Sequence, residues 1–123
     1  GAIDILNYLK DKYQLHIITN GFQEVQAKKM KSSKIQHYFD QVITSESVGV
    51  KKPNPLIFEH ALSVSKATKE NSIMIGDSLE ADIEGAINFG MKAIYFNPEN
   101  NINKSKNNVF LTVRSLLEIK QYL

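Results

Sequence analysis

Three short clusters of polar residues have the types and spacing that phosphate chemistry uses. The first is Thr19-Asn20-Gly21, which places a hydroxyl, an amide and a glycine directly after an apolar run. If a helix follows, its free N–H groups form an anion site, and a phosphate group would fit there. A purely structural interpretation is also open, in which Thr19 and Asn20 cap the helix and Gly21 turns the chain.

The second candidate is Lys52, in the segment Lys51-Lys52-Pro53-Asn54-Pro55. Asn54 can cap a helix whose first residue is Pro55, so Lys52 lies in a loop that fixes its position better than a helix face would. A lysine ammonium is a compact point charge that pairs well with phosphate oxygens or with a carboxylate. The alternatives are a solvated surface lysine, or Lys51 in the same role.

The third cluster is the segment Gly76-Asp77-Ser78-Leu79-Glu80-Ala81-Asp82, which also follows an apolar run. Carboxylates and water are the ligands that Mg²⁺ prefers. Asp77 is placed to bind the metal directly, whereas Asp82 can hold a metal-bound water or the lysine. In the structural alternative, Asp77 caps a helix and Asp82 is a favourable charge in its first turn. The ligand interpretation is preferred for Asp77, because ligands bind beyond the carboxyl ends of parallel strands.

The rest of the sequence predicts a scaffold that brings these strand ends together. Short apolar runs alternate with apolar residues at helical spacing, which favours a parallel sheet covered by helices on both faces. Ser115 with Glu118 has the spacing of a capping box for a last helix. The expected strands are 15–18, 41–44, 72–75, 93–96 and a short edge strand at 109–113, and the expected helices are 2–9, 22–35, 55–62, 83–89 and 116–123.

Composition bounds the class of protein. The 123 residues, 42% of them apolar, predict a single domain spanning 1–123. Lys and Arg exceed Asp and Glu by 15 − 13 = 2, which argues against a nucleic-acid partner. There is no cysteine for disulfides or thiolate chemistry, and no targeting signal or membrane-spanning apolar run. We therefore expect a soluble cytoplasmic protein without membrane contacts.

Taken together, the three clusters resemble the active-site motifs of the haloacid dehalogenase superfamily. Their order along the chain is more specific than any one of them, and the similarity extends over nearly the whole sequence. Among members, the chain looks most like the house-cleaning pyrimidine 5′-nucleotidases. The resemblance implies a three-layer, Rossmann-like α/β core. The segments that carry it are Ile18-Thr19-Asn20-Gly21, Gly49-Val50-Lys51-Lys52-Pro53 and Gly76-Asp77-Ser78 with Asp82.

The resemblance also implies roles for these residues. Thr19 and Gly21 would bind the transferring phosphoryl group, and Asn20 would help to shape the substrate pocket. Lys52 would neutralise negative charge on the phosphoryl oxygens. The reaction implied is attack by an aspartate on a phosphomonoester, giving an aspartyl-phosphate that water hydrolyses.

Two acidic residues complete the implied site. Asp77 would bind the Mg²⁺ cofactor, and Asp82 would be the outer acidic partner of that metal and of the lysine. The substrate would be a small phosphorylated metabolite, a nucleoside 5′-monophosphate by analogy with the pyrimidine nucleotidases.

The sequence departs from the family at the nucleophile. Members carry an Asp-x-Asp motif at the end of an N-terminal strand, followed by a helical cap, and neither is found here. The only aspartates before Thr19 are Asp4 and Asp11, which belong to the expected first helical segment or directly follow it, and neither follows an apolar strand. The absent strand would lie between the strands that end at Thr19 and Asp77. We therefore expect an incomplete core from a longer enzyme, inactive alone, whose two flanking strands pair directly or recruit another chain by self-association.

Other functions remain open from the sequence. The fold without its nucleophile would suit a catalytically silent binding or assembly module. A signalling receiver also orders a hydroxyl and then a lysine on successive strand ends, but its acidic pocket would come early in the chain. Within the superfamily, a sugar-phosphate phosphatase is an alternative, and a dehalogenase is disfavoured by Asp77 and Asp82.

Overall fold

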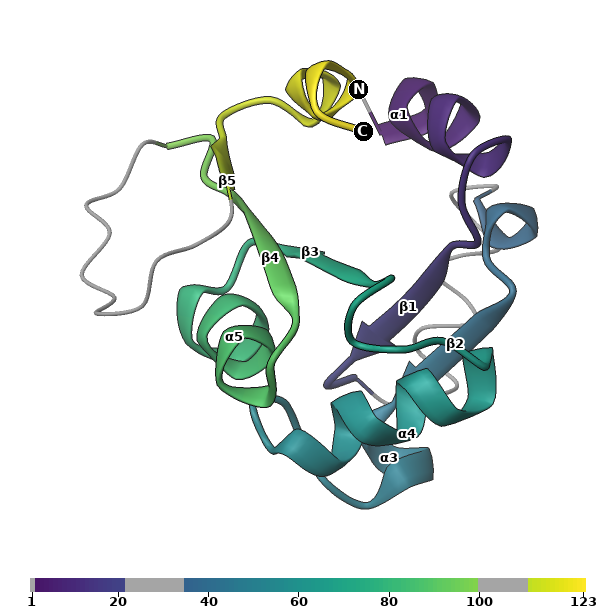
Figure 1. Ribbon diagram of the computed structural model, residues 1–123, viewed down its shortest axis with the longest axis vertical. Coiled ribbons are helices and arrows are strands. Elements are labelled where there is room, and N and C mark those ends of the chain that lie inside the picture. Colours follow the sequence, from purple (N-terminus) through teal and green to yellow (C-terminus); the bar gives the residue numbers. More distant parts are fainter. Residues whose placement is uncertain (1, 22–34, 100–110) are drawn as a thin grey trace.

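The computed structural model describes residues 2–21, 35–99 and 111–123, in which parallel strands alternate with helices (Figure 1). The predicted α/β class is confirmed, whereas the helix expected at 22–35 lies almost wholly outside the described residues. The strands are β1 (His16–Thr19), β2 (Gln41–Thr44), β3 (Ile73–Gly76), β4 (Lys92–Phe96) and β5 (Leu111–Val113). The helical elements are α1 (Ala2–Lys10), η1 (Gln36–Tyr38), α3 (Ser45–Val48), α4 (Pro55–Ser65), η2 (Leu79–Glu84), α5 (Gly85–Phe89) and η3 (Leu116–Gln121).

The strands form two separate parallel sheets. β1 pairs with β2, and β4 lies between β3 and β5. No ladder joins β1 to β3 within the described ranges, so the two strands that were expected to flank an absent one do not pair directly. Every residue of β1 and β3 is only half-buried, whereas Ala93, Ile94 and Tyr95 of β4 are buried. Inner strands of parallel sheets are normally buried, so this exposure fits an unfilled position between β1 and β3.

Two apolar clusters pack on opposite faces of the sheet formed by β3, β4 and β5. Successive side chains of a strand point to opposite faces, and β4 sends Ala93 and Tyr95 to one cluster and Ile94 to the other. α4 and α5 cover the first face, and α1 and η3 the second (Figure 1). The first cluster comprises Ile43, Ile57, Phe58, Ala61, Ile83, Ala86, Met91, Ala93 and Tyr95. The second comprises Ile5, Leu9, Ile94, Val113 and Ile119.

Local signals in the sequence set several element ends. The Asn54 side chain accepts a hydrogen bond from the Leu56 N–H at 3.0 Å, and Pro55 begins α4, as predicted. Gly90 ends α5 in the left-handed conformation with φ 107°, as predicted. None of the helices within the described ranges combines the length and the apolar character needed to cross a bilayer.

Two helical predictions need correction, and one helix was not predicted. The capping box at Ser115 and Glu118 is present, but the segment after it is a short 3₁₀ helix, η3, that ends at Gln121. The expected regular helix after Asp77 begins instead with the π-helical turn η2. α3 was not predicted, and its capping box pairs Thr44 with Ser47.

Candidate active site

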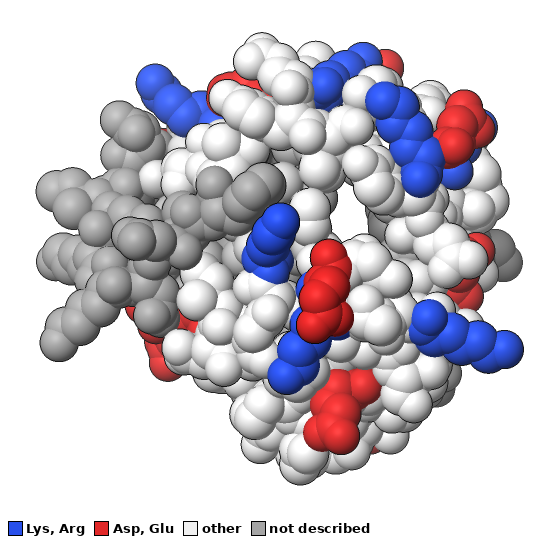
Figure 2. Space-filling model, in the orientation of Figure 1, with Lys and Arg blue, Asp and Glu red and all other residues white. Residues whose placement is uncertain are grey.

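A cavity of about 380 Å³ lies between β1 and β3, and the space-filling view shows the molecule hollowed there (Figure 2). It is bordered by the carboxyl end of β1, by β3 and by the polar residues that follow them. Four of the predicted site residues line it, namely Thr19, Lys52, Asp77 and Asp82, whereas Asn20 and Gly21 lie beside it. The other lining residues are Ile17, Ile18, Met74, Ile75, Gly76, Phe96 and Leu116.

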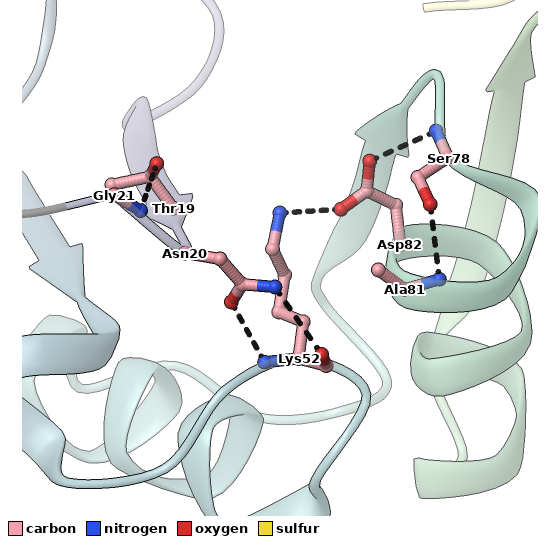
Figure 3. A network of polar contacts seen from close by, with 7 residues as sticks. All are labelled: Thr19, Asn20, Gly21, Lys52, Ser78, Ala81 and Asp82. Atoms are coloured by element: carbon pink, nitrogen blue, oxygen red, sulfur yellow. Dashed lines mark hydrogen bonds and ion pairs between the residues drawn. The ribbon is translucent and has the colours of Figure 1, made fainter.

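Lys52 and Asp82 form an ion pair at the wall of this cavity (Figure 3). The Lys52 Nζ lies 2.5 Å from Asp82 Oδ1, and the two side chains are 11% and 6% exposed. The second carboxylate oxygen, Oδ2, accepts a hydrogen bond from the Ser78 N–H at 3.2 Å. Both oxygens of Asp82 are therefore engaged, and a charge-assisted contact holds the ammonium group in place. Ser78 was not predicted as a site residue, although its position directly after Asp77 was a usable signal.

The turn that carries Asp82 is wider than an α-helical turn. The Ser78 carbonyl accepts hydrogen bonds from both the Asp82 N–H, at 2.9 Å, and the Ile83 N–H, at 3.2 Å. The Ser78 hydroxyl accepts a further one from the Ala81 N–H at 3.2 Å. π-type turns are rare and are often found at functional sites. Here the turn directs the Asp82 carboxylate back toward the end of β3.

Two glycines allow the segments of the site to approach closely. A Cβ at Gly76 would lie 2.3 Å from Asp82 Oδ2, so a side chain at this position would displace the carboxylate. A Cβ at Gly85 would lie 2.8 Å from the Cβ of Pro53, the residue after Lys52. The loop that carries Lys52 can therefore pack directly against the start of α5, because Gly85 has no side chain.

The end of β1 is joined to the Lys52 loop through Asn20. Its Oδ1 accepts a hydrogen bond from the Lys52 N–H at 2.8 Å, and its Nδ2 donates to the Lys52 carbonyl at 3.3 Å. The Ser45 hydroxyl donates to the Asn20 carbonyl at 3.1 Å. At Thr19 the hydroxyl oxygen accepts from the Gly21 N–H at 3.1 Å. The Asn20 amide therefore pairs with the backbone of Lys52 and does not line the cavity.

Asp77 is the residue best placed to bind a metal ion. It is exposed at the tip of β3, lines the cavity and has no hydrogen-bond or ion-pair partner among the described residues. No group of three or more potential metal-binding side chains (His, Cys, Asp or Glu) is found in the described ranges. Mg²⁺ commonly binds proteins through one or two carboxylates, with water and substrate phosphate completing its shell. A single free carboxylate beside a cavity of about 380 Å³ fits that mode of binding.

Known proteins are similar to this chain in sequence. The chain is 36% identical to the pyrimidine 5′-nucleotidase YjjG of Escherichia coli over 124 residues, covering 100% of the chain and 55% of that protein. It is 46% identical over 92 residues to the glyceraldehyde 3-phosphate phosphatase of Methanothermobacter thermautotrophicus, covering 74% of the chain and 41% of that protein. The chain thus spans about half the length of the relatives that it matches.

Solved structures and a family profile agree with these matches. The HAD-hydrolase YfnB of Bacillus subtilis, bound to magnesium, superimposes with a TM-score of 0.94 at 30% identity, over 98% of this chain and 54% of that one. A profile described as haloacid dehalogenase-like hydrolase matches residues 1–96, which include every candidate site residue. The chain therefore belongs to the haloacid dehalogenase-like hydrolase family.

Proposed function

We propose that this chain forms the phosphate- and Mg²⁺-binding part of a phosphomonoester hydrolase. The observation that carries the proposal is the convergence of Thr19, Lys52 and Asp77 on one cavity at the carboxyl ends of β1 and β3. A hydroxyl, a fixed ammonium group and a free carboxylate are the groups that a phosphate and a divalent cation need together. The names of the relatives, a nucleotidase and a phosphatase, support the same class of reaction.

Each residue has a distinct task in this proposal. The Thr19 oxygen accepts from the Gly21 N–H, so its own proton is left to donate to a phosphoryl oxygen. Lys52 compensates negative charge on the phosphoryl group, and Asp82 holds the ammonium in position. Asp77 would hold the Mg²⁺, which when bound neutralises charge on the phosphoryl oxygens.

The nucleophile in this proposal is an aspartate from outside these 123 residues. The sequence contains no Asp-x-Asp motif, and the relatives are about twice as long. A strand placed between β1 and β3 would deliver its last side chains into the cavity, beside Lys52 and Asp77. Its carboxylate would attack phosphorus, and the ester oxygen would leave with a proton from the second aspartate of an Asp-x-Asp motif. Water would then hydrolyse the aspartyl-phosphate and release inorganic phosphate.

The substrate proposed is a nucleoside 5′-monophosphate. The support is the match to YjjG, which runs over the entire chain. A second candidate is a triose or sugar phosphate, because the identity to the glyceraldehyde 3-phosphate phosphatase is higher, although over fewer residues.

The test is a hydrolysis screen on the product of the complete reading frame that encodes this chain. With Mg²⁺ present, we expect pyrimidine monophosphates to be hydrolysed faster than purine monophosphates, glyceraldehyde 3-phosphate and hexose phosphates. Removing the metal with EDTA should abolish turnover. Asp77→Asn should lower it by about 100-fold or more, because a metal supplies several kcal/mol of charge stabilisation.

The control is Glu80→Gln, which neutralises an exposed carboxylate three residues further on. Its turnover should stay within about twofold of the parent, as for surface substitutions away from a site. Turnover that survives EDTA and Asp77→Asn would refute the metal role. A complete product without an Asp-x-Asp motif and without turnover would favour the silent binding module, and turnover by residues 1–123 alone would refute the external nucleophile.

A further inference from the structure

The backbone of Lys52 is held by the side chain of a residue 32 positions earlier in the chain. Asn20 accepts from the Lys52 N–H at 2.8 Å and donates to the Lys52 carbonyl at 3.3 Å. The N–H and the C=O of Lys52 are thus both hydrogen-bonded to the planar side-chain amide of Asn20. Two residues in a hydrogen-bonded pair of neighbouring strands exchange the same two kinds of bond. Among the common polar side chains, only Asn and Gln present a donor and an acceptor in this geometry.

Asn20 is itself fixed on its other side. Its carbonyl accepts from the hydroxyl of Ser45, the first residue of α3, at 3.1 Å. The contacts then continue from Lys52 Nζ to Asp82, and from Asp82 to the N–H of Ser78 (Figure 3). One series of polar contacts therefore runs from the end of β2 to the end of β3, and Asn20 is the link that lies on the end of β1.

We propose that Asn20 is a positioning residue for Lys52, acting through the Lys52 backbone and not through a contact with substrate. The Asn20 amide is directed at the Lys52 loop and is not among the groups that line the cavity. A lysine has a long flexible stem, so fixing its backbone limits where the ammonium group can lie. The contribution of Lys52 to phosphate binding rests on the proposed function, whereas its placement by Asn20 does not.

The experiment measures the reactivity of Lys52 in the 123-residue chain, without substrate or turnover. Each lysine is acetylated with an amine-selective reagent, and its rate is read by peptide mass spectrometry relative to exposed Lys120 in the same molecule. In Asn20→Ala, Lys52 should react roughly tenfold faster than in the parent, because two hydrogen bonds that restrain it are lost. Hydrogen exchange at the Lys52 amide should accelerate by a similar factor.

Asn20→Asp provides a second, conservative variant. It keeps the acceptor for the Lys52 N–H and loses only the donor to the carbonyl, so amide exchange at Lys52 should stay within roughly twofold of the parent. Asn71→Ala is the matched control, since Asn71 accepts from the Thr68 N–H at 2.9 Å on an exposed loop away from the cavity. Asn71→Ala should leave the acetylation rate and the amide exchange rate of Lys52 unchanged.

The outcomes separate positioning from other roles. If Asn20→Ala leaves both rates at Lys52 unchanged while circular dichroism shows a folded chain, the proposal is wrong. If Asn20→Ala unfolds, all lysines and amides react together, and the acetylation rate of Lys52 in Asn20→Asp decides. A rate faster than in the parent would support the proposal, because the donor to the Lys52 carbonyl is lost, and a rate equal to the parent's would refute it. Because neither readout needs catalysis, a failure of the hydrolysis screen would not affect this test, and the reverse also holds.

Discussion

Replacing Asp82 with alanine is expected to lower the free energy of unfolding of this chain by about 3–5 kcal/mol, the range found when one partner of a buried ion pair is removed. The Lys52 side chain is 11% exposed and its Nζ pairs with Asp82 at 2.5 Å. Alanine would leave that ammonium and the Ser78 N–H without their acceptor. Urea unfolding, monitored by circular dichroism, measures the decrease in the free energy of unfolding.

Glu80→Ala is the control for Asp82→Ala. It removes an exposed carboxylate from the same turn and should change the free energy of unfolding by less than about 0.5 kcal/mol. The double variant Lys52→Met with Asp82→Leu removes both charges and should recover most of the loss, because an apolar pair of similar volume often replaces a buried ion pair without penalty. An Asp82→Ala variant as stable as Glu80→Ala would show that the pair does not hold the site together.

Lys52→Met is expected to lower kcat of the complete enzyme by about 100- to 1000-fold, with a smaller change in KM. The ammonium is fixed at the cavity wall, where, in the proposed function, it faces the negative charge that the transition state spreads over the phosphoryl oxygens. A group already in place stabilises that charge without reorganisation, so its loss should affect the chemical step more than binding. Steady-state kinetics on the best substrate of the screen provide both constants.

Lys51→Met is the matched control for this prediction. Lys51 is the adjacent lysine, is exposed and does not line the cavity. Its kcat should stay within about twofold of the parent. An equal decrease in kcat for Lys51→Met and Lys52→Met would indicate a general effect of positive charge, and would contradict a specific role for Lys52.

Much of the fold could be predicted because its signals are local. The strand predicted at 41–44 is found at Gln41–Thr44, and the one predicted at 72–75 begins and ends one residue later. Apolar runs bounded by polar residues define such strands without reference to the rest of the chain. Asn54 and Pro55 likewise define the start of α4 within a few residues of sequence.

The missed features depend on weak signals or on distant contacts. The capping box of α3 pairs the N-cap Thr44 with Ser47, and the usual capping box has Glu or Gln at the second of these positions. The wide turn at Asp82 depends on a carboxylate that reaches both Ser78 and Lys52, which local spacing does not show. The contact between Asn20 and Lys52 was missed for the same reason, because the two residues are 32 positions apart in the sequence.

The site residues were predicted from their order along the chain, and the structure adds how they are held. Thr19, Lys52, Asp77 and Asp82 were expected near one another because a single parallel sheet was predicted. The structure has two sheets, and all four residues line the cavity between β1 and β3. Their chemical tasks remain proposals. The open position between β1 and β3 also agrees with the absence of an Asp-x-Asp motif from the sequence.

The most direct test of the central claim is a nuclear magnetic resonance titration of this chain with Mg²⁺ and inorganic phosphate at constant ionic strength. The account predicts saturable shifts of the backbone amides of Thr19, Gly21, Lys52 and Asp77. Asp77→Asn should remove the response to Mg²⁺, and Lys52→Met should weaken the response to phosphate. Shifts scattered over exposed lysines, or a response unchanged in both variants, would contradict a phosphate and metal site at the ends of β1 and β3.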